Sequence, residues 1–118
     1  MAMIIRAELM LPGLQYVEPQ FFNSMTTMHA LVMIFGVVMP GIVGFANCLL
    51  PMMIGAPDMA LPRTNNWSFW ILPFTFSLLL TLFLPTGGPA GGWTAYPPLV
   101  LQTEMSSPFL IFAVHPCA

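Results

Sequence analysis

The chain has 118 residues, of which 58% are hydrophobic and only 5% are charged, with a formal net charge of −2. An average soluble chain carries ~25% charged residues, so an ordinary soluble domain is excluded. The two basic residues are too few to neutralise a run of phosphates, which excludes nucleic-acid binding. Ten Phe and three Trp exclude a disordered chain, because such chains are poor in aromatic residues.

The few charged residues leave two long neutral stretches between them. Residues 19–57 and 64–103 contain no charge, whereas a transmembrane helix needs only ~20 apolar residues. The composition therefore predicts an all-α membrane protein. The charged residues are Arg6, Glu8, Glu18, Asp58, Arg63 and Glu104.

The first segment, residues 1–11, is expected to be the end of a membrane helix. Pro12 and Gly13 follow it and break the helical pattern. Its charges do not follow the order of a signal peptide, in which a positive group precedes a longer apolar core. Residues 14–24 are predicted to be a surface loop with aromatic side chains near the membrane interface.

The first complete span is predicted over about residues 25–50, with Ser24 as its N-cap and Pro51 directly after it. Pro40 and Gly41 are expected to kink this helix, which a bilayer helix tolerates because neighbouring segments satisfy the freed backbone groups. Small residues allow close helix approach at three positions. These are Gly36, Gly41 and Gly44.

A second span is predicted over about residues 67–84, after a proline-rich interfacial loop at residues 51–66. Trp67 and Trp70 are expected to anchor it at the interface. A Gly/Pro-rich loop from Pro85 leads to a third apolar segment, residues 109–118. This segment and the first are too short to cross a bilayer, so we expect the chain to be a fragment of a larger protein.

His29 is the strongest candidate for chemistry, because an ionisable group inside a span is a functional candidate. A neutral imidazole in apolar surroundings is a common ligand of metal ions and of haem iron; the alternative is a histidine hydrogen-bonded to a neighbouring helix. At 3.6 residues per turn, His29 and Asn47 share one stripe with small residues between them. The stripe suits a flat cofactor, and a glycine-rich packing face explains it nearly as well.

Three polar residues gather at the other end of this span. Asn47, Asp58 and Asn65 are expected on one side of the membrane, where a carboxylate backed by water-ordering amides could take up protons. An ordinary solvated loop has the same composition, and the residues by themselves favour that interpretation. Arg6 is similarly open to a second interpretation, as a side chain that snorkels to the interface.

The sequence lacks the motifs of soluble enzymes. It has no nucleophile elbow, no Gly-rich phosphate loop with lysine, and no Cys or His pair at zinc spacing. Its two cysteines, Cys48 and Cys117, form no disulfide framework. Cys48 is expected to be a small buried hydrophobe.

Three strings of the sequence, in this order, carry a family resemblance: residues 27–35 (TMHALVMIF), 50–66 (LPMMIGAPDMALPRTNN) and 92–99 (GWTAYPPL). They closely resemble subunit I of the haem-copper oxidases, in the form of the bacterial cytochrome c oxidases, and the resemblance covers nearly the whole chain. The family fold has twelve transmembrane helices. The chain would supply the end of helix I, the complete helices II and III, and the start of helix IV.

The resemblance implies a role for each candidate residue. His29 matches an axial ligand of the low-spin haem a, Arg6 the arginine that hydrogen-bonds the haem formyl group, and Trp93 a tryptophan near the haem propionates. Asp58 matches the mouth of a proton-uptake path. The resemblance further implies two small sets: Asn47 and Asn65, which order water in that path, and Glu8, Gly13 and Gln15, where relatives bind a calcium or sodium ion.

The resemblance also implies an activity, namely reduction of dioxygen to water with electrons from cytochrome c, coupled to proton pumping. Oxidase subunits II and III would be partners, in a bacterial inner membrane. The alternatives are a quinol-oxidising relative and a non-catalytic membrane fragment. The ligands of the high-spin haem and of copper lie beyond residue 118 in the family, so the 118-residue chain alone is expected to be inactive.

The sequence departs from the family pattern in three places. Cys48 replaces a usual tryptophan, and Thr64 replaces a common methionine. The chain ends in His115-Pro-Cys-Ala, where apolar residues normally continue. We expect His115 to be a packing residue.

Overall fold

The structure is a computed structural model that describes residues 1–86, 88–102 and 106–115. Its described residues form helices and irregular segments, with no strand among them. In chain order the helices are α1 (Ala2–Glu8), α2 (Pro19–Met33), a π-helical turn (Ile34–Val38), α3 (Met39–Ile54), α4 (Pro62–Thr86), a 3-10 turn (Leu99–Gln102) and α5 (Ser106–Val114).

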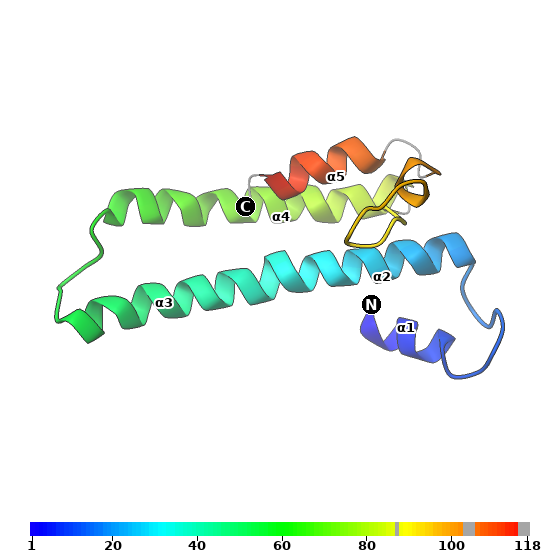
Figure 1. The fold of residues 1–118 in the computed structure, drawn as a ribbon, viewed down its shortest axis with the longest axis horizontal. Helices are drawn as coiled ribbons and strands as arrows, with labels where there is room; N and C mark the ends of the chain where they lie inside the picture. Colours follow the sequence, from blue (N-terminus) through cyan, green and yellow to red (C-terminus); the bar gives the residue numbers. More distant parts are fainter. Residues whose placement is uncertain (87, 103–105, 116–118) are drawn as a thin grey trace.

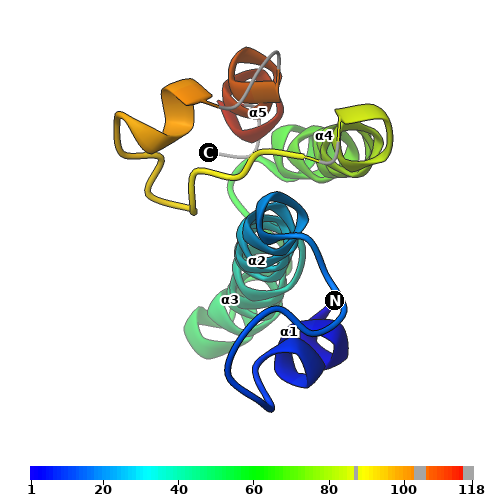
Figure 2. The ribbon, with the colours of Figure 1, turned by 90° about the vertical axis from the view of Figure 1, so that its right-hand side faces the viewer.

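One long hairpin of helices dominates the molecule. α2, the π turn and α3 form a continuous helix of 36 residues, and α4 returns beside it in the opposite direction (Figure 1). α1 lies beside α2, and α5 lies beside α4 (Figure 2). The loop at residues 88–102 therefore reaches the same end of the hairpin as the α1–α2 loop.

Both long helices have the length and composition of a membrane span. They cover Pro19–Ile54 and Pro62–Phe83, and only 6% and 11% of their most apolar windows are buried. The core helix of a soluble protein would be mostly buried. The exposed side chains instead include many large apolar ones, such as Ile42, Phe45 and Phe74, as expected where lipid or further helices cover them.

The long helix begins earlier than the sequence predicts. Glu18, in an extended conformation, is its N-cap, and Pro19 occupies the first turn. Proline suits that position because its fixed φ is helical and its missing N–H would have no partner there. The prediction of Ser24 as the N-cap is therefore wrong, and the predicted loop at 14–24 ends at residue 18.

The loop between the long helices is shorter than the predicted 51–66. α3 continues through Pro51 to Ile54 and ends at Gly55, whose φ of +70° is left-handed; glycine adopts this conformation without steric cost. α4 begins at Pro62, so Arg63 and Asn65 lie in its first turn and not in the loop.

The predicted kink takes the form of a π-helical turn, Ile34–Val38, directly before Pro40. Proline lacks an N–H, and its ring collides with the carbonyl four residues earlier in a regular helix. The wider π turn relieves this conflict, and it inserts one residue into the helical repeat. The helix face that meets α4 therefore changes its register at this turn.

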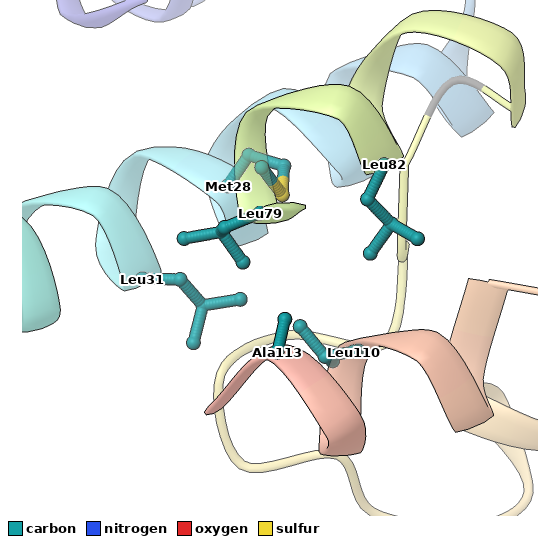
Figure 3. Packing of buried hydrophobic residues seen from close by; sticks show 6 residues of the cluster. All are labelled: Met28, Leu31, Leu79, Leu82, Leu110 and Ala113. Carbon is teal, nitrogen blue, oxygen red and sulfur yellow. The ribbon is translucent and has the colours of Figure 1, made fainter. Parts of the chain in front are cut away.

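A buried apolar cluster joins α2, α4 and α5 (Figure 3). It lies in the half of the hairpin that carries the α1–α2 loop and the loop at residues 88–102. Lipid is as apolar as leucine, so in a bilayer such helices associate through close packing and polar contacts rather than through expulsion of water. The cluster consists of Met28, Leu31, Leu79, Leu82, Leu110 and Ala113.

Close approach of the two long helices occurs at Gly36. A Cβ atom added there would lie 2.5 Å from Cε2 of Phe76 on α4. At Gly41 and Gly44 an added Cβ would meet nothing within 4 Å in the described part of the chain. Of the three glycines expected at a close helix contact, only Gly36 makes one here.

Two predictions about cysteines have different outcomes. Cys48 is exposed, so the prediction of a buried hydrophobe is wrong. The neighbouring Asn47 faces α4, and adjacent residues point ~100° apart around a helix, which turns Cys48 away from the contact. Cys117, together with the end of the predicted segment 109–118, lies outside the described residues.

Candidate functional site

His29 lies on α2 beside the helix–helix contact. Its neighbour Met28 is completely buried in the apolar cluster with Leu31, whereas His29 is half-buried. Since successive helical residues point ~100° apart, the imidazole lies on the flank of α2 and not on the face that meets α4. Within the described residues the imidazole forms no hydrogen bond. No helix in the described part of the chain supplies the hydrogen-bond partner of the alternative interpretation.

The π turn separates two polar residues that the sequence places on one stripe. Before the turn, Met28, Leu31 and Phe35 pack toward α4. After the turn, Asn47 does so. The regular repeat of 3.6 residues predicts His29 and Asn47 on a common face, and this prediction is wrong because the inserted residue rotates one half of the helix against the other.

Arg6 and Trp93 belong to the same end of the molecule as the start of α2. Arg6 is exposed in the last turn of α1, where a cation suits the negative end of the helix dipole. Trp93 lies in the loop at residues 88–102, which is bonded to α2, and its side chain is 65% exposed. Within the described residues no hydrogen bond joins Arg6, His29 and Trp93 to one another.

Two hydroxyl groups that the sequence analysis missed attach this loop to α2. Ser24 Oγ lies 3.1 Å from the carbonyl oxygen of Gly88, to which it donates. The backbone N–H of Gly92 donates to Thr27 Oγ1 at 3.0 Å. The available signal is two hydroxyl residues three apart at the start of an apolar span, since such residues bond across helices in membranes.

Glu8 closes the α1–α2 loop. Its Oε1 accepts the N–H of Gln15 at 2.9 Å, and its Oε2 accepts the N–H groups of Tyr16 at 2.8 Å and Val17 at 3.2 Å. These bonds, those of Gln15 and Tyr16 most of all, hold the pKa of Glu8 below its usual value of 4.5, and they outweigh the opposing effect of burial. Glu8 is thus an ionised, buried anchor for the loop backbone.

The expected cation-site residues are grouped in this same loop. Gly13 has a φ of +100°, which glycine adopts readily. The side-chain amide of Gln15 donates to the carbonyl of Pro12 at 3.3 Å. A carboxylate offers about four acceptor positions, and in Glu8 three of them are used by backbone N–H groups.

Asn47 and Asn65 meet at the opposite end of the hairpin. Asn47 Nδ2 of α3 donates to Asn65 Oδ1 of α4 at 3.1 Å, and both side chains are half-buried. This bond joins the two long helices near their connecting loop. The sequence predicts only that the two amides share a side of the membrane, and the structure brings them into direct contact.

A cavity of about 380 Å³ lies beside this amide pair, between α3 and α4. Its lining is apolar except for the two amides and the hydroxyl of Ser68. A water molecule occupies about 30 Å³ in the liquid and needs polar partners to be ordered. The cavity is large enough for several waters, and its polar groups are concentrated at the end near the loop.

Asp58 lies in the short loop beyond the amide pair and is exposed. Its Oδ1 accepts the N–H of the next residue, Met59, at 2.8 Å, and no other described residue bonds to the carboxylate. The carboxylate is therefore open to water on the surface, in the same loop region that leads to Asn47 and Asn65. The structure shows no direct hydrogen bond from Asp58 to either amide.

The fold and these residues define the class of protein, which is a multi-pass helical membrane protein. Residues 1–117 match the model of the family described as "Cytochrome C and Quinol oxidase polypeptide I". "Cytochrome c oxidase subunit 1" of Eremothecium gossypii is 50% identical over 121 residues, a match that covers 98% of this chain and 23% of that protein.

The chain belongs to the cytochrome c and quinol oxidase polypeptide I family, which confirms the predicted family and the all-helical membrane fold. It spans less than a quarter, 23%, of the length of the relative named above. The family implies a haem cofactor in general, and the surroundings of His29 can be compared with what a haem requires.

The surroundings of His29 fit a haem ligand. A haem needs an imidazole nitrogen without a competing partner and a largely apolar wall, and the described residues offer the ring no hydrogen bond. The side chains one turn away on either side of His29 are mainly apolar, with Met25 before it and Val32 and Met33 after it. His29 thus presents a half-buried imidazole among mainly apolar side chains of a membrane helix, and such a ring could hold a haem iron.

Proposed function

We propose that this chain works within a complete haem-copper oxidase subunit I. There it binds low-spin haem a through His29 and leads protons inward from Asp58. The observation that carries the proposal is the arrangement of polar groups along the hairpin. An imidazole without a hydrogen bond to the described residues flanks α2 at one end, and at the other end Asn47 and Asn65 line a cavity between the helices whose connecting loop carries the exposed Asp58. The complete enzyme reduces dioxygen to water and pumps protons.

Three residues of the chain are proposed to hold the haem. When bound, the haem supplies a one-electron redox centre. His29 would hold the iron through a ring nitrogen, and the half-buried position of the ring would limit its rotation. The guanidinium of Arg6, at the end of α1, is proposed to donate a hydrogen bond to the formyl group, and the indole N–H of Trp93 to bind the propionate region.

Protons are proposed to enter through the loop between α3 and α4. Asp58 collects them at the surface, because its carboxylate is exposed and bonds to a single backbone N–H within the described part of the chain. Asn47 and Asn65 order water along the cavity between the helices, where the Ser68 hydroxyl supplies a further polar group. The amides cannot carry a proton themselves, so their role is to orient the waters that do.

The cation site at Glu8, Gly13 and Gln15 is a further part of the proposal. Glu8 retains one acceptor position beyond its three backbone bonds. Oxygen atoms of Gly13 and Gln15 would complete a site for a calcium or sodium ion, which prefers oxygen ligands. The ion would add to the closure of the α1–α2 loop that the carboxylate already provides.

The proposed setting follows from the family. Oxidase subunits II and III would bind around the exposed apolar faces that lipid does not cover, and cytochrome c would donate electrons, as the name of the relative indicates. A bacterial inner membrane remains our proposal for the location, although that relative comes from a fungus. On this proposal, the purified 118-residue chain consumes no oxygen.

The central test replaces His29 in the complete, assembled oxidase. His29→Ala should abolish the optical band of the low-spin haem, because the iron loses an axial ligand. His115→Ala is the matched control: it removes the other histidine, which is exposed at the end of α5, and should leave the band unchanged. A normal low-spin band in the His29→Ala enzyme would refute the proposed function.

A further inference from the structure

Two prolines from different helices line one cavity in the middle of the hairpin. Pro40 follows the π turn of the long helix Pro19–Ile54, and Pro73 lies in the interior of α4, which runs antiparallel to it (Figure 1). The cavity has a volume of about 200 Å³. A proline inside a helix lacks the N–H that would bind the carbonyl four residues earlier. Both helices therefore have freed carbonyl groups near the middle of a membrane span.

The π turn leaves more than one carbonyl without a donor. The N–H of Met39 donates to the carbonyl of Ile34, five residues earlier, and the proline that follows has no N–H. The carbonyl of Val38, the N-cap of α3, accepts the first bond of the regular helix after the turn. The carbonyls of residues 35–37 are thus left with a single N–H of the helix, that of Gly41.

Freed carbonyls of both helices belong to residues that line this cavity. One donor cannot serve three acceptors, so at least one of the carbonyls of Phe35 and Gly36 is free within its helix, and both residues line the cavity. In α4 the carbonyl of Phe69 has no donor, because its regular partner would be the N–H of Pro73. Phe69 lines the same cavity.

The side chains around the cavity offer these carbonyls no hydrogen bond. The lining side chains are apolar, and Leu72 and Phe76 complete it on the α4 side. The nearest hydroxyl groups of α4, those of Ser68 and Thr75, donate to other carbonyls of their own helix. Inside a bilayer a carbonyl without a donor is costly, and freed helix carbonyls are tolerated where a neighbouring helix or an ordered water satisfies them.

Water fits this cavity in size and in chemistry. A water molecule occupies ~30 Å³ in the liquid, which is much less than the volume of the cavity, about 200 Å³. It carries two hydrogens, so one molecule can donate to a carbonyl of each helix. A route for entry also exists, since the amide-lined cavity of about 380 Å³ adjoins this one. The two cavities share the lining residues Phe35, Pro40, Phe69 and Leu72.

We propose that the cavity between Pro40 and Pro73 is a water-binding site that bridges the two long helices. The bound water donates to the carbonyl of Phe69 and to a freed carbonyl of the π turn, that of Phe35 or Gly36. The site stabilises the π turn and therefore the register in which α3 meets α4. It does not depend on the haem proposed at His29, because its ligands are backbone atoms of the hairpin.

The direct test is a high-resolution structure of the complete oxidase. Density for water should lie about 2.7–2.8 Å from the carbonyl oxygen of Phe69, the usual length of an O–H···O bond, and at a similar distance from the carbonyl of Phe35 or Gly36. Lipid density in the cavity would overturn the proposal. A side chain from elsewhere in the subunit that donates to the freed carbonyls in place of water would also overturn it.

Radiolytic hydroxyl labelling, read by mass spectrometry, tests the same site in variants of the complete oxidase. Radicals formed from a bound water modify adjacent side chains, so the ring of Phe76 should be labelled. Pro73→Ala returns an N–H to the carbonyl of Phe69 and should lower this labelling. Combination with Pro40→Ala, which returns a donor to the π turn, should abolish it.

Pro51→Ala is the matched control, because Pro51 also lies inside a helix but lines neither cavity. Labelling of Phe76 should stay unchanged in this variant. Unchanged labelling in the combined Pro40→Ala and Pro73→Ala variant would contradict the water site, and so would an equal loss in Pro51→Ala. The haem spectrum of each variant reports whether the oxidase has assembled.

Discussion

The two ends of the helical hairpin are built in different ways. One end carries the α1–α2 loop and the loop at residues 88–102. There Glu8, Ser24 and Thr27 bond to the backbone of these two loops, and an apolar cluster joins three helices. Toward the other end, which carries the α3–α4 loop, a hydrogen bond between Asn47 and Asn65 joins the two long helices beside a cavity of about 380 Å³.

This difference matches what each end is proposed to do. A redox cofactor needs fixed surroundings, because its potential depends on nearby charges and hydrogen bonds. A proton path needs space for water and a few polar groups to orient it. The end with the α1–α2 loop and the end with the α3–α4 loop can be tested separately, because a variant at one end leaves the residues of the other end unchanged.

The largest effect on activity is expected from Asp58→Asn, in the α3–α4 loop of the complete oxidase. Positioned proton-transfer groups typically contribute about 10²–10⁴-fold to a rate, and loss of the surface carboxylate should reduce turnover toward the lower part of that range. Oxygen consumption and proton pumping in reconstituted vesicles measure it, with haem content as the control. A normal rate with normal pumping would remove Asp58 from the path.

The next largest effect, on stability, is expected at Gly36, in the π turn between the two ends of the hairpin. Gly36→Ala places a methyl group 2.5 Å from the Phe76 ring, and such overpacking costs about 1–3 kcal/mol. Gly41→Ala is the matched control, because its Cβ meets nothing within 4 Å in the described residues. Thermal unfolding in detergent should show a loss of stability for Gly36→Ala only; equal behaviour of both variants would contradict the close contact.

A smaller effect is expected at the amide pair. Asn47→Ala removes the bond to Asn65, which should cost about 1 kcal/mol. A double-mutant cycle with Asn65→Ala isolates the interaction, and the coupling energy should be close to that value. Additive losses in the double variant would mean that the two amides do not stabilise each other.

The smallest effect on overall stability is expected from the titration of Glu8, which holds the α1–α2 loop. Its folded pKa is lowered, so its contribution to stability is complete above the ordinary value of 4.5 and is lost as the pH falls through the lowered value. Protection of the Gln15, Tyr16 and Val17 amides, corrected for intrinsic exchange, should decline in that acidic range. Glu8→Gln should show low protection at neutral pH, and a pH-independent wild-type loop would contradict the anchor.

Much of the architecture could be predicted from the residues themselves. Two neutral apolar stretches of this length require two membrane helices, and the prolines and glycines between them indicate where the chain turns. The exact helix ends do not follow from the residues in the same way, because proline is found both after the end of a helix and in its first turn. Pro19 and Pro62 begin helices here, and each extends its helix by about one turn or more beyond the predicted start.

The candidate site divides in the same way. Residue type and membrane position identified His29, Asp58, Asn47 and Asn65 as candidates, and the family resemblance assigned their roles. The hydroxyl anchors at Ser24 and Thr27 were missed, because the backbone groups that they bind lie 64 and 65 residues further along the chain. No local pattern reports a contact over that separation.

The sequence by itself therefore determined that this is a helical membrane protein, which family it belongs to, and which residue types are available for chemistry. Burial, periodicity and charge are local properties, and they are sufficient for those conclusions. Only the tertiary structure decided which faces meet. The π turn before Pro40 shifts the helix register by one residue, so that His29 lies on the flank of α2 while Asn47 meets Asn65. The change of register arises because the ring of Pro40 would collide with a backbone carbonyl in a regular helix. α4 then packs against the faces that the π turn presents to it.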